Sequence, residues 1–221
     1  MKGSLPCVAA CILAALLLLA CTPGRDRLRS GDLVFVGIPA DYRVDDSMDA
    51  AIAASTGAAA GLNLIHVAIA EVQADSVWII DATLRRGVDR HPLADFLLDF
   101  TLKDGSLPTF VVKRLRKPFP VEESLARARD LCGMPYDTLF LAGNEARYCS
   151  ELVRDCYLDA EGRHLFEEQP MNWLDADGNM PPYWTWLFGQ MGMEVPQGQP
   201  GTNPQDMARS PLLREVKVSI P

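Results

Sequence analysis

The chain has 221 residues, and its 21 Lys and Arg against 29 Asp and Glu give a net charge of −8. This length suits a single domain with an ample core. An acidic chain without clustered basic side chains argues against a nucleic-acid partner, because phosphate binding needs a concentrated positive patch. The short basic stretches at 25–29 and 113–117 are expected to be solvated, although the first could also touch anionic lipid.

The first twenty residues have the pattern of an export signal. Lys2 supplies a positive charge, and an apolar run from Val8 to Leu19 ends at Ala20 and Cys21. The run is too short for a membrane-spanning helix, which needs roughly 20 apolar residues. The segment Leu-Leu-Ala-Cys resembles a bacterial lipobox, which implies that Cys21 is diacylated and begins the mature chain. The alternative is an ordinary secretory signal with an incidental cysteine.

This pattern divides the chain into three parts. We expect a lipoprotein signal peptide at 1–20, a short lipid-anchored tether at 21–30 and one domain at 31–221. Two acyl chains hold a protein stably at a membrane surface, whereas one does not. The predicted location is therefore the cell envelope, with the protein lipid-anchored to a bacterial membrane.

The mature chain would keep two kinds of cysteine besides the anchor. Cys132 and Cys156 could form a disulfide or pack as two separate buried thiols, and Cys149 is left over. The chain has no CxxC or HExxH motif and only three histidines. We therefore predict no metal site and no cofactor.

Hydrophobic patterning predicts one domain that mixes strands and helices, without internal repeats. In chain order we expect a strand at 33–38 buried on both faces, a helix at 45–60, strands at 64–71 and 76–82, a helix at 91–100, a strand at 109–115, helices at 121–132 and 149–160, and, within long ordered loops at 170–211, a short helix at 184–191 before a last strand at 214–219.

The second and third strands carry two candidate site residues. Alternation places His66 on one face with Leu64, Ala68 and Ala70, a neighbourhood of mostly small side chains that leaves room for a partner or substrate. Asp81 ends the next strand, and if the two strands are antiparallel neighbours it can reach and orient the His66 ring. The alternatives are a core histidine and a turn-forming aspartate.

Cys149 lies where a loop containing Gly143 and Asn144 becomes a helix. The positive end of the helix macrodipole favours the thiolate, which is the nucleophilic form of cysteine. The N-terminal amides could also stabilise an oxyanion on a substrate carbonyl. A buried structural cysteine is the alternative, but together with His66 this position predicts a thiol nucleophile and its base.

Five segments resemble, in order, the motifs of the YaeF/YiiX-type permuted papain-like cysteine hydrolases, which are relatives of the NlpC-type cell-wall peptidases and of lecithin retinol acyltransferase. They are GDLVF at 31–35, HVAI at 66–69, IDA at 80–82, PYD at 135–137 and YCSELV at 148–153. In this family the histidine strand precedes the cysteine helix, as it does here. The resemblance implies an α+β, circularly permuted papain-like (NlpC-like) fold, with a central, mostly antiparallel sheet and the nucleophile helix packed on it.

The resemblance also implies a role for each candidate residue. Cys149 would be the nucleophile, His66 the base and Asp81 the orienting acid, at a position where the family usually has Glu. Tyr136 and Tyr148 would line the substrate pocket, or else are simply packed aromatic residues.

The predicted function is a cysteine hydrolase that acts on an amide bond, most directly in a cell-envelope peptide. The alternatives are a lipid ester or amide hydrolase or acyltransferase at the membrane, and a non-catalytic lipoprotein that binds a peptide or a lipid-like small molecule. The segment 167–211 separates them. Aromatic side chains from this segment in the cleft would favour lipid, and polar ones would favour peptide.

Overall fold

The computed structural model describes residues 27–40, 42, 48–57, 61–218 and 220. The predicted signal peptide, the predicted anchor Cys21 and most of the tether lie outside the described residues, so they stay predictions. The fold presented here is that of the compact unit Leu28–Val216. None of the helices in the described ranges combines the length and the apolar composition that crossing a membrane requires.

A six-stranded antiparallel sheet forms the centre of this unit, in the order β4-β3-β2-β1-β5-β8. Residues 33–38 of β1 are all buried, which agrees with the prediction of a strand covered on both faces. The strands are β1 (Leu33–Pro39), β2 (Leu62–Gln73), β3 (Ser76–Thr83), β4 (Gly87–Pro92), β5 (Thr109–Leu115) and β8 (Leu213–Val216).

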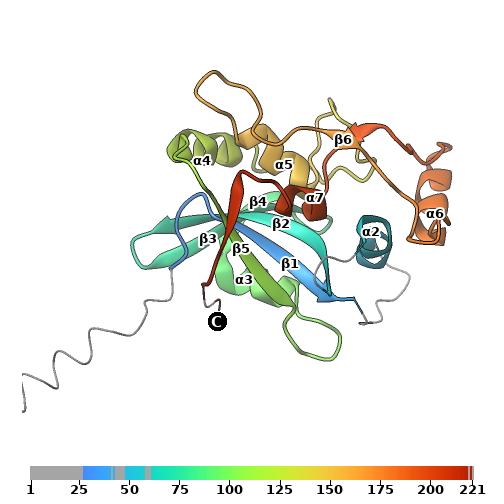
Figure 1. The fold of residues 1–221 in the computed structure, drawn as a ribbon, viewed down its shortest axis with the longest axis horizontal. Coiled ribbons are helices and arrows are strands. Elements are labelled where there is room, and N and C mark those ends of the chain that lie inside the picture. The colour runs from blue at the N-terminus through green and yellow to red at the C-terminus, as the bar shows by residue number, and fades with distance from the viewer. Residues whose placement is uncertain (1–26, 41, 43–47, 58–60, 219, 221) are drawn as a thin grey trace, which may run out of the picture. The chain divides into compact units, whose positions relative to one another are not determined.

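Helices cover both faces of the sheet, as Figure 1 shows. One face carries α4 (Val121–Asp130), α5 (Cys149–Cys156) and α7 (Pro204–Ala208), and the opposite face carries α3 (Leu93–Asp99). The sheet and its helices thus give the α+β architecture that was predicted, with α5 packed against β2 and β3. The remaining elements are α2 (Met48–Thr56), α6 (Pro182–Gln190) and a small ribbon of β6 (Gln169–Pro170) with β7 (Pro200–Gly201).

The helix α7 and the β6–β7 ribbon were not predicted, the last strand ends at Val216, and two predicted helices have different bounds because of tertiary contacts. The helix expected at 91–100 starts only at Leu93, because the residues up to Pro92 form β4 and pair with β3. The helix expected at 149–160 ends at Cys156, because Tyr157 leaves the helical conformation. Its ring stacks on Phe119 and its hydroxyl donates to the Gly31 carbonyl at 3.0 Å, so Tyr157 ties the end of α5 to the start of β1.

The segment after α5 is held by aromatic packing. Trp173 and Trp184 meet edge to face with ring centroids 4.7 Å apart, and both contact Phe140 in the same way. The Trp184 indole N–H donates to Ser55 Oγ at 3.0 Å, and that hydroxyl donates to the Trp173 carbonyl at 2.9 Å. These contacts join α6 to α2, which lies next to β2.

Phe96 anchors α3 beneath the sheet. Its side chain is fully buried, and its ring contacts those of His66, His91 and Phe110. Three strands therefore share one aromatic contact from α3.

Replacing Phe96 by alanine should lower the free energy of unfolding by about 3–5 kcal/mol, because it removes a fully buried aromatic ring. Leu98→Ala in the same helix is the matched control, since Leu98 is 72% exposed and its loss should cost no more than about 0.5 kcal/mol. Urea denaturation of both variants measures the two values. Equal losses in the two variants would contradict this packing of α3.

Candidate active site

The site forms where β2 and β3 stop pairing. The hairpin of these strands has a two-residue turn, and its ladder runs from the Gln73–Ser76 pair to the Ile69–Ile80 pair and goes no further. Beyond that point β3 continues to pair with β4, and β2 with β1. The His66 and Asp81 side chains meet across the parted strands, with His66 Nε2 2.8 Å from Asp81 Oδ2.

A β-bulge fixes the direction of His66. Val36 pairs with His66 but Gly37 pairs with Leu64, so Ile65 is an extra residue on β2. The bulge breaks the alternation of side chains. Leu64 joins the core under α5 with Val67, whereas the His66 ring faces Phe100 of the α3 side at a centroid distance of 4.6 Å. The prediction that Leu64 shares the face of His66 is therefore wrong.

Cys149 is the first residue of α5 and is 5% exposed. Tyr148 before it is extended, with φ −94° and ψ 169°, and caps the helix without a side-chain hydrogen bond. The Glu151 carboxyl accepts from the Tyr148 backbone N–H instead, which is half of a capping box. Burial raises the pKa of Glu151 to about 8. The Cys149 side chain therefore takes no part in capping the helix.

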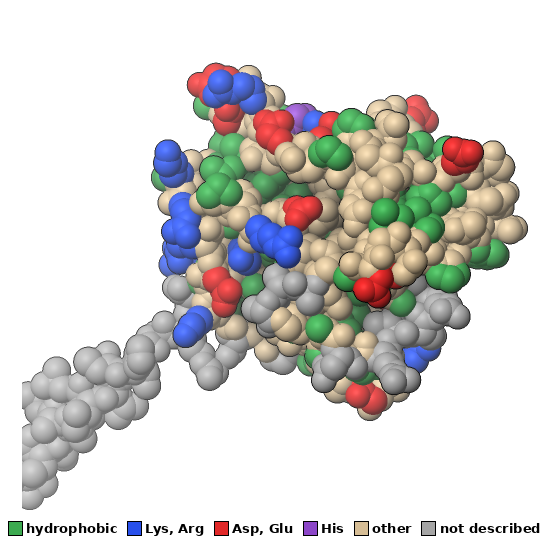
Figure 2. Space-filling model, turned by 45° about the vertical axis from the view of Figure 1, so that its right-hand side comes forward, with side chains coloured by type: hydrophobic (Ala, Val, Ile, Leu, Met, Phe, Trp, Pro, Cys, Tyr) green, Lys and Arg blue, Asp and Glu red, His purple; other side chains and the backbone are tan. Residues whose placement is uncertain are grey.

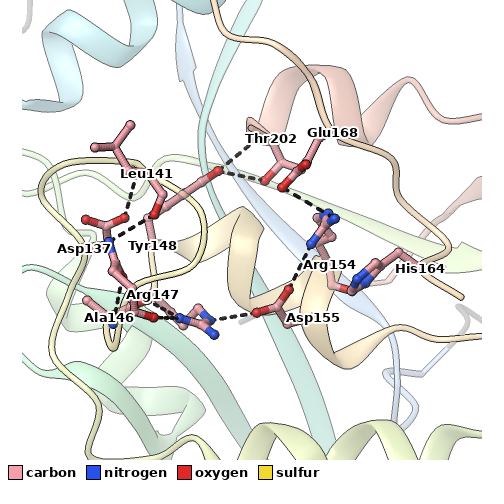
Figure 3. Close-up of polar contacts among 11 residues, drawn as sticks. Asp137, Leu141, Ala146, Arg147, Tyr148, Arg154, Asp155, His164, Glu168 and Thr202 are labelled. Carbon is pink, nitrogen blue, oxygen red and sulfur yellow. Dashed lines mark hydrogen bonds and ion pairs between the residues drawn. The ribbon is translucent and has the colours of Figure 1, made fainter. Parts of the chain in front are cut away.

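The loop before Cys149 is held by a network of polar contacts (Figure 3). The Asp137 carboxylate accepts from the backbone N–H of Leu141 at 2.9 Å. Arg147 donates to the Ala146 carbonyl at 2.6 Å and to Asp155 on α5 at 2.7 Å. The network therefore joins the loop to α5, the helix that begins at Cys149.

Tyr148 closes the other side of this junction. Its hydroxyl accepts from the Thr202 backbone N–H at 3.0 Å, and the Thr202 hydroxyl lies 3.1 Å from that of Ser150. Tyr148 is 3% exposed and packs against Phe140. The predicted pocket residue Tyr148 thus also fixes the start of α5 against the chain near β7.

The His66 ring interacts with both of its proposed partners. Burial lowers the pKa of His66, but the charge of Cys149 and hydrogen bonds with Asp81 and Cys149 outweigh the burial and raise that pKa to about 10. Because Asp81 occupies Nε2, Nδ1 is the ring nitrogen that remains for the thiol. The arrangement therefore favours the protonated, imidazolium form of the His66 ring.

The other two cysteines of the described unit are free thiols. Burial raises the pKa of Cys156 to about 12 and also raises the pKa of half-buried Cys132. Of the two possibilities left open by the sequence, the structure shows separate thiols rather than a disulfide.

Two hollows open beside the Cys149–His66 pair, one lined by Cys149 and the other by His66. The thiol pocket, of about 40 Å³, is lined by Cys149, Tyr148, Phe140 and Trp184, among others. The histidine groove, of about 640 Å³, contains His66 and opens between α3, α6 and the turn after β3. Tyr136 lines both, so this predicted pocket residue lies at the junction of the two hollows. Burial and the charge of Cys149 raise the pKa of Tyr136 well above its usual value.

Sequence reasoning assigned no role to His91. The structure places it in β4, 3% exposed, with Nε2 3.8 Å from Asp81 Oδ1. The pairing of β4 with β3 produces this contact, and residues 87–92, which include a glycine, a proline and two charged side chains, have no strand-like pattern that would have revealed it.

Comparisons with known proteins agree with this fold. The chain is 29% identical over 120 residues to the uncharacterized protein YiiX of Escherichia coli strain K12, a match that spans 53% of this chain and 58% of that protein. A crystal structure described as that of the metalloprotein yiiX from Escherichia coli O157:H7 is similar with a TM-score of 0.65 and 21% identity, over 89% of this chain and all of that one.

A family model covers more of the sequence than the YiiX alignment does. The model described as permuted papain-like amidase enzyme, YaeF/YiiX, C92 family, matches residues 27–217. This range contains the whole sheet, α5 and each residue of the candidate site. The chain therefore belongs to the permuted papain-like amidases of the YaeF/YiiX type, the C92 family.

Proposed function

We propose that this chain is a thiol hydrolase that cleaves an amide bond whose acyl part is apolar. Cys149 is the nucleophile, His66 the general acid and base, and Asp81 the residue that orients the ring. The observation that carries the proposal is the 2.8 Å contact of His66 Nε2 with Asp81 in a ring that also interacts with Cys149. A cysteine-histidine pair with a third orienting group is the general arrangement of an activated thiol.

The proposed reaction has two halves. The Cys149 thiolate attacks the carbonyl carbon, the C–N bond breaks, and His66 gives its proton to the leaving amine, so that a thioester forms. Water then attacks the thioester and loses a proton to His66, which releases the carboxylic acid and restores the Cys149 thiolate and the protonated His66. Since Cys149 begins α5, the backbone N–H groups of the first helical turn can stabilise the oxyanion in both halves.

The lining of the histidine groove supports an apolar acyl group. The groove, of about 640 Å³, is much larger than the thiol pocket, of about 40 Å³, so the groove has more room for the bulk of a substrate. Three of its lining side chains are large, hydrophobic and more than half exposed, namely Leu84, Leu98 and Trp186. Exposed apolar surface beside a site indicates a ligand that covers it.

The segment 167–211 contributes aromatic side chains to both hollows. Tyr183 and Trp186 of α6 line the groove, and Trp173 and Trp184 line the thiol pocket. On the face shown in Figure 2, hydrophobic side chains lie across the right-hand part and also at the upper left, while Lys and Arg lie mostly on the left. A lipid anchor at Cys21, if present as predicted, would keep such a site near a membrane, where amphiphilic amides are found.

A cell-envelope peptide without an acyl chain is the second candidate. Three charged residues, Asp49, Arg85 and Asp99, also line the groove, and they can contact polar peptide groups. Arg85 and Asp99 already pair with each other at 2.8 Å, which leaves less of their charge for a substrate. Among the described residues, no group of three or more His, Cys, Asp or Glu side chains could hold a metal ion.

A series of amides with acyl groups from acetyl to dodecanoyl tests the substrate class. We expect kcat/KM to rise by about twofold to fourfold per added methylene until the groove is filled, because each buried methylene contributes up to about 0.8 kcal/mol. Trp186→Ala should flatten this rise, and Cys149→Ala should abolish turnover. Met193→Ala is the control for Trp186, because Met193 is 38% exposed but does not line the groove.

The outcomes of this series distinguish a hydrolase of amides with apolar acyl groups from a peptide hydrolase and from a binding protein without turnover. Turnover of unacylated peptides with no dependence on chain length would replace the proposal by the peptide candidate. Saturable binding of the amides with no turnover in the wild type would identify a binding protein rather than an enzyme.

The raised pKa of His66 makes a separate prediction about stability. A group with a higher pKa in the folded state contributes stability below its unfolded value of 6.5, and this contribution disappears as the pH rises through about 10. The difference in free energy of unfolding between wild type and His66→Gln should therefore shrink between about pH 7 and pH 10. Urea denaturation across this pH range measures it, and a constant difference would show that His66 holds no tightly bound proton. In a Cys149→Ser background the decline should be smaller and should end at lower pH, because the charge of Cys149 no longer raises the folded-state pKa of His66.

A further inference from the structure

His91 is a buried histidine that the proposed reaction does not use. It is 3% exposed, and neither of its ring nitrogens has a hydrogen-bond partner among the described residues. The same is true of Asp81 Oδ1, the oxygen that His66 does not occupy. Buried polar atoms without a partner are uncommon, so two of them facing each other need an explanation.

The two unpartnered groups lie 3.8 Å apart, from His91 Nε2 to Asp81 Oδ1. This is longer than a hydrogen bond, so in this conformation the contact acts through charge. On the other side of the ring, His91 Nδ1 lies 3.6 Å from Oδ2 of Asp89, which is 40% exposed and also lies 3.7 Å from Arg86. Each ring nitrogen of His91 therefore has a carboxylate oxygen within 4 Å, one from Asp81 and one from Asp89.

Asp81 needs such a neighbour. Its side chain is fully buried, and a buried carboxylate with a single hydrogen bond is costly unless its second oxygen also meets a donor or a positive charge. The histidine of β4 brings a ring nitrogen to 3.8 Å from that oxygen. A carboxylate held at one oxygen only can turn about its terminal torsion and lose its alignment with the His66 ring.

We infer that His91 is a positioning residue of the site, which holds Asp81 Oδ1 from β4 so that Oδ2 stays on His66 Nε2 and His66 Nδ1 stays directed at Cys149. His91 is not among the residues that line the thiol pocket or the histidine groove, so we place its effect on the site in its contact with Asp81. The shared contact of His66 and His91 with Phe96 keeps both rings in place on either side of the carboxylate. The inference rests on the proposed Cys149–His66 pair.

The rate of alkylation of Cys149 by iodoacetamide at pH 6 tests it without any substrate. His91→Phe keeps the aromatic packing on Phe96 but removes both nitrogens, and it should slow the reaction by about fivefold. His91→Gln keeps an amide donor and should stay within about twofold of the wild type. His164→Gln is the remote control, because His164 bonds to the Arg154 carbonyl, and it should change nothing.

A double-mutant cycle shows whether His91 acts through Asp81. In an Asp81→Asn background, His91→Phe should cause no further loss, whereas two independent losses that multiply would overturn the inference. Equal rates for folded His91→Phe and wild type would also overturn it, as would equal losses in His91→Phe and His91→Gln. If His91→Phe does not fold, His91→Leu serves the same comparison.

The same experiment separates this inference from the function on which it rests. If wild-type Cys149 reacts no faster than Cys132, the proposed Cys149–His66 pair fails and the role of His91 falls with it. If wild-type Cys149 reacts much faster than Cys132 and the His91 variants match the wild type, the positioning role alone fails.

Discussion

The site depends on one hydrogen bond across an opening in the sheet. The β2–β3 ladder ends at the Ile69–Ile80 pair. Beyond this end the strands separate, and His66 of β2 and Asp81 of β3 are joined by a side-chain hydrogen bond rather than by backbone pairing. This opening lets the first residue of α5, which packs on one face of the sheet, interact with a histidine whose ring faces the other. If the ladder continued for two more pairs, the backbone would fill the space in which the thiol and the imidazole meet.

Electrostatics and packing support each other around this bond. Burial alone would make the His66 imidazole neutral, and the neighbouring thiol and carboxylate reverse that tendency. Phe96 and Phe100 pack against the ring from the α3 side, and the apolar surroundings strengthen its contact with Asp81. On the other side, the Arg147 network and the Tyr148–Thr202 contact hold the start of α5 in place, so the position of the thiol does not depend on one loop alone.

The sequence was sufficient for the parts of the site that depend on local pattern. The short turn between two apolar runs predicts the hairpin that brings Asp81 toward His66, and the change from loop to helix predicts the place of Cys149. The bulge that turns Leu64 away from His66 arises from pairing with β1, and β4 has no periodic pattern of its own. The contact of His91 with Asp81 follows from strand pairing, so neither strand predicts it alone.

Mass spectrometry of the acylated protein is the most direct test of the central claim, that Cys149 is a nucleophile activated by His66. The protein is mixed with an activated acyl ester, quenched in acid and digested, and the acyl group is assigned to a peptide. We expect an acyl thioester on Cys149 within the first turnover, little on Cys132 or Cys156, and slower formation in His66→Ala. An acyl group found on another residue, or equal acylation of Cys149 in wild type and His66→Ala, would contradict this claim.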